Sequence, residues 1–220
     1  LQRNLRPNVT ALTVHPPGEV FQRPLQATGE IEILGLEPGQ SAELRPGPQA
    51  TPRPPTLLSP FGRRLVQRGI QTFTWRAEDP NGDTLGYEVH YRAVGDATWR
   101  LLRSGLNDAV LAWDTSTVPD GRYVIRVTAS DAPSNPGGQA LQSEKISPAF
   151  DVDNTPPRVE RLKAVAGKEG LRISFAAADG FSVLRDAAVS VDAGDWSSVR
   201  PQDGLHDALT ERYDVVLPTP

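Results

Sequence analysis

The segment WDTSTVPDGRYVIRVTASD, residues 113–131, decides the fold class of this chain. In its second half every other residue is apolar, and residues two apart in an extended chain share one face. This apolar set consists of Tyr123, Ile125, Val127 and Ala129. Because the residues between them are mostly polar, the pattern predicts a strand that is buried on one side only.

A turn precedes this strand. Pro119 presets φ for a chain reversal, and the Asp120-Gly121 pair tolerates the tight backbone that completes it. A tyrosine two residues after such a reversal can donate its hydroxyl to the turn backbone, which is the tyrosine corner of β-sandwich domains. We therefore expect Tyr123 to make this hydrogen bond within an all-β fold.

Composition excludes several classes of function. With 220 residues the chain can bury one large core or two ordinary ones. Cysteine is absent, so the chain has no disulfide, no thiolate nucleophile and no zinc site built on thiolates. No apolar run is long enough for a membrane span, and the first residues lack a signal-peptide pattern. Because the sequence starts at Leu1 and contains no methionine, we expect a piece of a longer protein.

The net charge of −4 is unevenly distributed. Residues 1–76 carry nine arginines and five glutamates, a balance of +4, which leaves −8 for the remainder. The arginines are scattered and no aromatic residues alternate with them, so we do not expect a nucleic-acid partner.

Eleven of the 21 prolines lie in residues 1–60, which excludes a helix there. Two short pieces, residues 9–14 and 30–36, still have the composition of strands. We interpret residues 1–53 as an ordered proline-rich arm whose strand-like pieces pair with each other or along a neighbour's edge. Residues 46–55 are its most linker-like part.

Residues 54–155 show strand patterns at short, regular intervals, each bounded by turn residues. Phe73, Trp75 and Ala77 share one face of the first clear strand, and Tyr87, Val89 and Tyr91 share one face of the next. Shorter strands are expected around Trp99, at residues 110–113 and, as a last strand, at residues 141–152. Seven strands in about 100 residues is the immunoglobulin-like count.

The second half repeats this pattern at an offset of about 100 residues. Trp75 corresponds to Phe175, Val89 to Val189, and the Gly95-Asp96 pair to Gly194-Asp195. Val118-Pro119 corresponds in this register to Leu217-Pro218. We therefore expect a second sandwich over residues 156–220, truncated before its last two strands.

These residues resemble the fibronectin type III and immunoglobulin-like modules of bacterial multidomain proteins. The resemblance rests on Trp75, on Tyr87 and Tyr91, on the turn at residues 118–121 and on the alternation that follows it. The junction FDVDNTPPRV, residues 150–159, is similar to linkers between tandem modules. The paired repeats also resemble sandwich modules that follow β-propellers in bacterial surface and periplasmic proteins, including sensor proteins. The resemblance implies tandem fibronectin III-type sandwiches in a secreted, periplasmic or cell-surface protein.

We expect no catalytic residues. His15, His90 and His206 are the only histidines, and none lies in a metal or nucleophile motif. No Gly-rich phosphate loop, HExxH or GxSxG motif occurs. His90 alternates outward beside Glu88 and Arg92, so we interpret it as a surface residue.

We also expect no cofactor or metal ligand, and calcium is the alternative. Calcium binds six to eight oxygens, and carboxylates cluster in Glu78-Asp79-Pro80-Asn81-Gly82-Asp83, at Asp131, and at Asp151, Asp153 and Asn154 in the junction. The junction resembles the Asp- and Asn-rich linkers of cadherins. Against calcium, Pro-Asn-Gly-Asp is an ordinary turn composition, Asp and Asn cap turns with their own side chains, and the EF-hand spacing is absent.

Carbohydrate binding is a further alternative, because sandwich modules often expose tryptophans to sugars. Trp75 lies on the inward face and is expected in the core, whereas Trp99, Trp113 and Trp196 could be exposed. Trp99 and Trp196 follow equivalent turns, and packing over a sheet edge explains both without a ligand.

The sequence thus predicts a non-catalytic structural or protein-interaction module of a larger exported bacterial protein. Its partner would be a neighbouring domain of the same polypeptide or a second chain that completes the second sandwich. The alternative is a carbohydrate-binding or sensory module attached to a β-propeller. Fold resemblance alone does not select between these functions.

Overall fold

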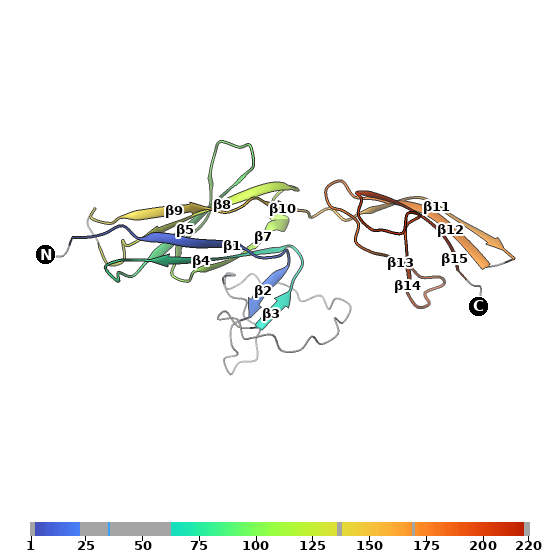
Figure 1. Ribbon diagram of the computed structural model, residues 1–220, viewed down its shortest axis with the longest axis horizontal. Coiled ribbons are helices and arrows are strands. Elements are labelled where there is room, and N and C mark those ends of the chain that lie inside the picture. The colour runs from blue at the N-terminus through green and yellow to red at the C-terminus, as the bar shows by residue number, and fades with distance from the viewer. Residues whose placement is uncertain (1–2, 23–34, 36–62, 136–137, 169, 218–220) are drawn as a thin grey trace. The chain divides into compact units, whose positions relative to one another are not determined.

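The computed structural model describes residues 3–22, 35, 63–135, 138–168 and 170–217 (Figure 1). The chain forms two compact units, Leu1–Val152 and Asp153–Pro220. Apart from a single 3-10 turn at Thr115–Thr117, all regular structure in the described residues is β-strand. The strands form antiparallel sheets consistent with β-sandwich architecture, as the sequence predicted.

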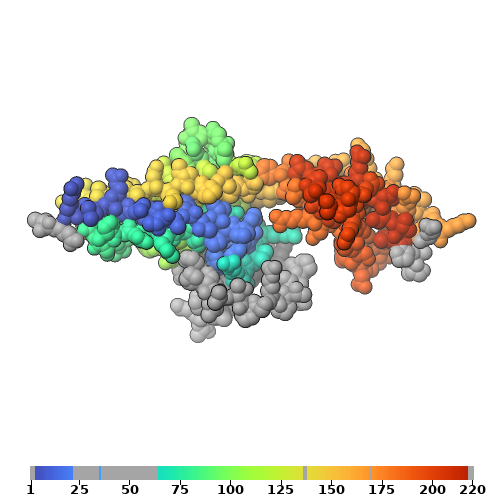
Figure 2. Space-filling view, viewed as in Figure 1, coloured from blue at the N-terminus to red at the C-terminus, as the bar shows by residue number. Residues whose placement is uncertain are grey.

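In the first unit, one sheet has the order β1-β4-β7, formed by Asn8–Val14, Ile70–Glu78 and Val110–Asp114. The other sheet has the order β10-β8-β5-β6, formed by Phe150–Val152, Gly121–Ser130, Gly86–Ala93 and Arg100–Leu106. β9 (Gln142–Ile146) pairs with the other half of β8. β9 lies beside β1 (Figure 2). Lys145 Nζ on β9 donates to the Thr10 carbonyl on β1.

The expected last strand at residues 141–152 is therefore two strands. Pro148 separates β9 from β10, because proline has no N–H for the ladder. The buried Ser147 replaces the missing pairing: its Oγ accepts a hydrogen bond from the Ile125 N–H at 3.1 Å and donates to the Pro148 carbonyl.

The core of the first unit lies between its two sheets, and the alternation in β8 is confirmed. Tyr123, Ile125, Val127 and Ala129 are all buried, with Ile125, Val127 and Ala129 fully so. They pack with inward residues of the opposite sheet, namely Val9, Phe73, Trp75, Leu111 and Trp113. Tyr123 donates its hydroxyl to the Pro119 carbonyl at 2.8 Å, so the expected tyrosine corner is present.

The structure corrects the boundary of the proline-rich arm. β1 lies within residues 1–53 but pairs with β4 along the edge of the first sheet, so it belongs to the sandwich expected at residues 54–155. Residues 9–14 form a strand as expected, and of the two pairings left open for it, the one along the edge of an adjacent strand is observed. Of the second expected piece, residues 30–36, only Gly35 is described: its carbonyl accepts from the Ala112 N–H of β7. Residues 46–55 lie outside the described residues.

The chain between β1 and β4 also adds a hairpin, β2 (Glu19–Gln22) with β3 (Arg63–Val66). It covers the face of β4 that points away from the sandwich core. Val20 packs on Ile70 and Ala112, and Thr72 Oγ1 donates to the Glu19 carbonyl at 2.6 Å. Both faces of the first part of β4 are consequently buried, which the alternation of its sequence does not reveal.

The second unit repeats this plan in part. Its main sheet has the order β11-β12-β15, formed by Arg158–Gly167, Gly170–Ala178 and Thr210–Leu217. A separate two-stranded sheet pairs β13 (Ala187–Val189) with β14 (Ser197–Val199). Its buried cluster consists of Ile173, Phe175, Ala177, Leu184, Val199 and Tyr213.

Strand pairing corrects one part of the predicted repeat register. Gln71 pairs with Trp113 in the first unit, whereas its counterpart Leu171 pairs with Leu217 in the second. Leu217 is therefore the last residue of β15 and takes the place of Trp113; it is not the counterpart of Val118 in the turn that precedes β8. In the described part of the second unit no strand occupies the position of β8, so its truncation stays a prediction.

Candidate functional site

Three carboxylates converge at one end of the first unit. Asp79 and Asp83 lie in the turn after β4, and Asp131 immediately follows β8. Each offers a carboxylate oxygen, and these oxygens lie within 4.8 Å of one another. Asp131 is fully buried. The structure thus brings together three of the residues that the sequence analysis singled out for calcium, Asp79, Asp83 and Asp131.

Hydrogen bonds from the protein occupy most of these oxygens. Asp79 Oδ1 accepts from the N–H groups of Asn81 at 2.8 Å and Asp83 at 3.2 Å. Asp131 Oδ1 accepts from the Leu141 N–H at 2.6 Å, and its Oδ2 accepts from Asn4 Nδ2 at 2.8 Å. Asp83 Oδ2 accepts from Asn135 Nδ2 at 2.8 Å. Asp79 Oδ2 alone is buried without a hydrogen-bond partner.

The same hydrogen-bond network holds Asn4 and Leu5 against the sandwich. Asn4 Nδ2 also donates to the Gln139 carbonyl, and the Leu5 N–H donates to Asn81 Oδ1 at 2.7 Å. Buried carboxylates with several N–H donors are well suited to hold loops in one conformation. The geometry therefore accounts for most of these oxygens through loop hydrogen bonds, and the three ligand oxygens that converge are fewer than the six to eight that calcium takes.

In the second unit, an aspartate caps the equivalent turn without a cluster of carboxylates around it. Asp179, the counterpart of Asp79, accepts from the N–H groups of Phe181 and Ser182, both at 2.8 Å. The position equivalent to Asp83 is Val183. Capping of the turn is therefore common to both units, whereas the cluster of carboxylates is found only in the first among the described residues.

The junction acids are not part of this cluster. Asp151 pairs with Arg122 Nε at 2.9 Å across β10 and β8. Among residues whose placement is described, the group of possible metal ligands includes neither Asp151 nor Asp153, and Glu78 lies outside it as well.

The four tryptophans have different environments. Trp75 and Trp113 are buried in the first core, which confirms the expectation for Trp75. Trp99 lies against two guanidinium groups, with Arg92 Cζ 4.6 Å and Arg126 Cζ 4.8 Å from the ring centroid. Trp196 is 75% exposed. Only Trp196 thus presents a freely accessible ring for a sugar.

One arrangement near His15 was not expected from the sequence. His15 Nε2 lies 2.9 Å from Thr74 Oγ1, and His15 Nδ1 lies 3.6 Å from a Glu19 carboxylate oxygen. Carboxylate, imidazole and hydroxyl follow one another as in a catalytic triad. Thr74 is only 7% exposed, however, and Arg64 also pairs with Glu19 at 3.2 Å. These contacts join the β2–β3 hairpin to β4.

Burial lowers the pKa of His15 below its usual value, and the charge of Arg64 adds to this effect. Glu19 opposes both, because a nearby carboxylate favours the protonated ring. The His15 ring also packs edge-on against Phe21 with centroids 4.8 Å apart. The lowered pKa favours the neutral form of the ring, and His15 therefore acts mainly as a packing residue.

The other two histidines have separate surroundings. His90 Nε2 lies 3.4 Å from a Glu88 carboxylate oxygen on β5. The His206 ring lies 6.0 Å from the Tyr213 ring in the second unit. Neither contact provides a nucleophile with its base.

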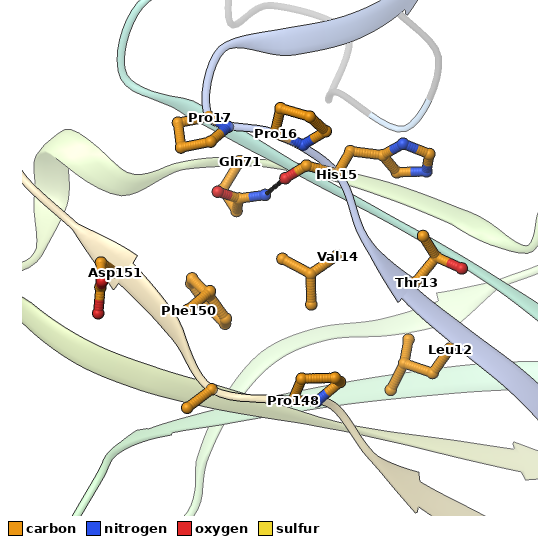
Figure 3. Close-up of a pocket in the computed structure, with 11 residues that line it drawn as sticks. Leu12, Thr13, Val14, His15, Pro16, Pro17, Gln71, Pro148, Phe150 and Asp151 are labelled. Atoms are coloured by element: carbon orange, nitrogen blue, oxygen red, sulfur yellow. Dashed lines mark hydrogen bonds between the residues drawn. The ribbon is translucent and has the colours of Figure 1, made fainter. Parts of the chain in front are cut away.

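A cavity of about 640 Å³ opens beside β1 and β10 (Figure 3). Its lining is mostly apolar and includes Leu12, Val14, Pro16, Pro148 and Phe150. Its polar lining residues include Gln71, whose amide nitrogen already donates to the His15 carbonyl, and Asp151, whose carboxylate pairs with Arg122. The imidazole ring of His15 points away from Phe150 in Figure 3. The cavity offers apolar contact and little specific chemistry.

No helix among the described residues has the length and apolar character needed to cross a membrane. Comparison of the chain with protein-family models, with curated proteins and with solved structures finds no match.

Proposed function

We propose that this chain is a non-catalytic structural or protein-interaction module of a larger exported bacterial protein. The observation that carries the proposal is the strand arrangement of the first unit. A β1-β4-β7 sheet packs on a sheet ordered β10-β8-β5-β6, and a tyrosine corner closes the turn before β8. We infer from this combination a fibronectin III-type sandwich, a fold whose usual role is to space or present other domains.

The chemistry of the described side chains supports a non-catalytic role. The clustered aspartates accept hydrogen bonds from loop residues, as Asp131 does from Leu141. The His15 imidazole and the Thr74 hydroxyl contact each other under the β2–β3 hairpin. Such groups stabilise the sandwich instead of meeting a substrate.

The proposal is tested by affinity purification of the tagged natural protein from its host, followed by cross-linking mass spectrometry. We expect reproducible cross-links from this chain to another folded domain, unaffected by added sugars. A protein that forms no such cross-links but binds a sugar saturably would contradict the proposal.

The second candidate is a carbohydrate-binding or sensory module, and the exposure of Trp196 favours it. Stacking of a sugar on this ring requires no rearrangement of the protein. If this function holds, Trp196→Ala abolishes sugar binding measured by calorimetry, whereas Trp99→Ala, which removes a ring covered by arginines, leaves it intact.

A further inference from the structure

Trp99 lies over two arginines on the outer face of one sheet of the first unit. Arg92 of β5 and Arg126 of β8 place their Cζ atoms 4.6 Å and 4.8 Å from the centroid of its ring. Arg126 lies between the buried residues Ile125 and Val127 of β8, so its side chain points away from the core. A guanidinium group is attracted to the face of a tryptophan and stacks on it. Trp99 therefore orders two positive charges on the solvent-facing side of the sheet.

Strand pairing places exposed apolar side chains beside these arginines. His90 of β5 is paired with Leu101 of β6 on one side and with Arg126 of β8 on the other. Arg126 is in turn paired with Ile146 of β9. Residues that are paired across strands project from the same face of a sheet, so these four side chains form one row. Leu101 is 55% exposed and Ile146 is 48% exposed, so both are accessible to a partner.

The two arginines under Trp99 are less completely paired than the neighbouring Arg122. Arg122, on the same face of β8, has its Nε atom 2.9 Å from an Asp151 oxygen. Arg126 Nη1 lies 3.5 Å from an oxygen of Glu144, whose side chain is 57% exposed. Arg92 Nη1 donates to a backbone carbonyl at 2.7 Å, and within the described part of the chain it has no carboxylate partner. Arg92 is thus able to pair with an acid from outside.

The same face retains hydrogen-bond donors. Considering the described residues only, the Nε atoms of Arg92 and Arg126 are buried without an acceptor. An unpaired buried donor costs free energy, which an oxygen ligand recovers when it reaches the donor. Guanidinium groups form short, charge-assisted and often bidentate hydrogen bonds with carboxylates. The chemistry of these donors therefore favours an acidic ligand.

The surrounding charges narrow the kind of acid. Glu88 and Glu144 are both paired with Thr128, so they lie in the row next to that of Arg126. Their side chains are 47% and 57% exposed. An exposed acidic row repels a polyanion such as nucleic acid, because like charges that meet across an interface are unfavourable. A single carboxylate flanked by apolar groups avoids this repulsion and matches the exposed apolar side chains of the face.

We propose that this face, formed by Arg92, Trp99, Leu101, Arg126 and Ile146, binds a segment of a partner protein that presents a carboxylate between apolar side chains. The carboxylate pairs with Arg92, and the apolar side chains contact Leu101 and Ile146. Because Trp99 already orders the guanidinium groups, binding costs little side-chain entropy. Tryptophan and arginine are also the residues most enriched at interface hot spots. This surface is the interaction site of the module proposed above and rests on that proposal.

The test uses the folded protein and a fluorescein-labelled peptide that carries Leu-Glu-Leu units separated by glycine and serine. Fluorescence anisotropy should show saturable binding, and the same peptide with Leu-Gln-Leu units should not bind. Arg92→Gln removes the guanidinium without an acid and should weaken binding at least about tenfold, as expected when a charge-assisted hydrogen bond is lost. Trp99→Leu should weaken binding as well, although both arginines remain. Arg122→Gln is the matched control, because Arg122 already pairs with Asp151, and it should bind as the wild type does.

Calorimetric melting checks that each variant is folded. If Arg92→Gln does not fold, the comparison of the two peptides on the wild-type protein still decides. Absence of saturable binding, or equal binding by folded Arg92→Gln and wild-type protein, overturns the proposal. Binding of heparin without binding of the Leu-Glu-Leu peptide assigns the face to a polyanion and also overturns it. A partner domain that is retained equally by wild type and Arg92→Gln leaves the interaction function in place but overturns this surface.

Discussion

Tyr123 and Tyr213 are both buried, yet only Tyr123 has a partner for its hydroxyl. Tyr123→Phe removes the hydrogen bond to the Pro119 carbonyl, so we expect the free energy of unfolding to fall by about 1 kcal/mol. Tyr213→Phe removes an unsatisfied buried hydroxyl and should be neutral or stabilising. Calorimetric melting of both variants checks this, and equal destabilisation by the two changes would contradict it.

His15 should make stability depend on pH. Because its pKa in the folded state lies below the usual 6.5, the unfolded state binds more protons between these two values. The stabilisation is therefore complete above about pH 6.5 and is lost as the pH falls through the lowered pKa. Melting temperatures from pH 7.5 to pH 5 should show this decline, and His15→Gln should reduce it. A variant with the same slope as the wild type would show that another group is responsible.

The three clustered aspartates should differ in their contribution to stability. Asp131→Ala breaks buried hydrogen bonds to Asn4 and Leu141, and we expect a loss of about 2 kcal/mol. Asp83→Asn removes one of three mutually repelling charges and keeps an oxygen for Asn135, so in the presence of chelator its effect should lie within about 0.5 kcal/mol.

The melting temperature of each variant is measured with chelator and with excess calcium. A melting point of the wild type that rises with calcium, while that of Asp83→Asn does not, would show that the cluster holds a cation, since a ligand bound only by the native state stabilises it.

At the scale of elements, the β2–β3 hairpin should stabilise the first sheet by covering β4. Val20 is fully buried against Ile70 and Ala112, so Val20→Ala should cost about 2 kcal/mol. Val66 of the same hairpin is 84% exposed, and Val66→Ala should change stability by less than about 0.5 kcal/mol. Denaturant unfolding of both variants measures the difference. Similar values would mean that the hairpin does not pack on the sheet in solution.

At the scale of the whole molecule, the two units should differ in local stability. β5 is paired on both sides, whereas β13 has three residues and a free edge among the described strands. Hydrogen exchange by mass spectrometry should therefore show faster exchange in residues 187–199 than in β5 and β8, since exposed backbone hydrogen bonds open readily. Equal protection would indicate that the edge is already covered.

Local features of this protein could be predicted from its sequence. Alternation from Tyr123 to Ala129 and the Pro119 turn predicted β8 and its corner, because period-two burial and turn chemistry depend on neighbouring residues. The repeat at an offset of 100 residues located β12 for the same reason. The predicted repeat register was wrong at Leu217, because the register between strands is set by their pairing and not by spacing along the chain.

Which distant segments meet could be seen only in the folded protein. β1 completes a sheet with β4 across more than fifty intervening residues, and the hairpin between them buries Thr72 on a face that its sequence pattern leaves polar. Asp79, Asp83 and Asp131 were candidates as separate acids, but their convergence depends on β4 and β8 ending at the same end of the sandwich. Contacts of this kind arise from packing between sheets, which no local pattern encodes.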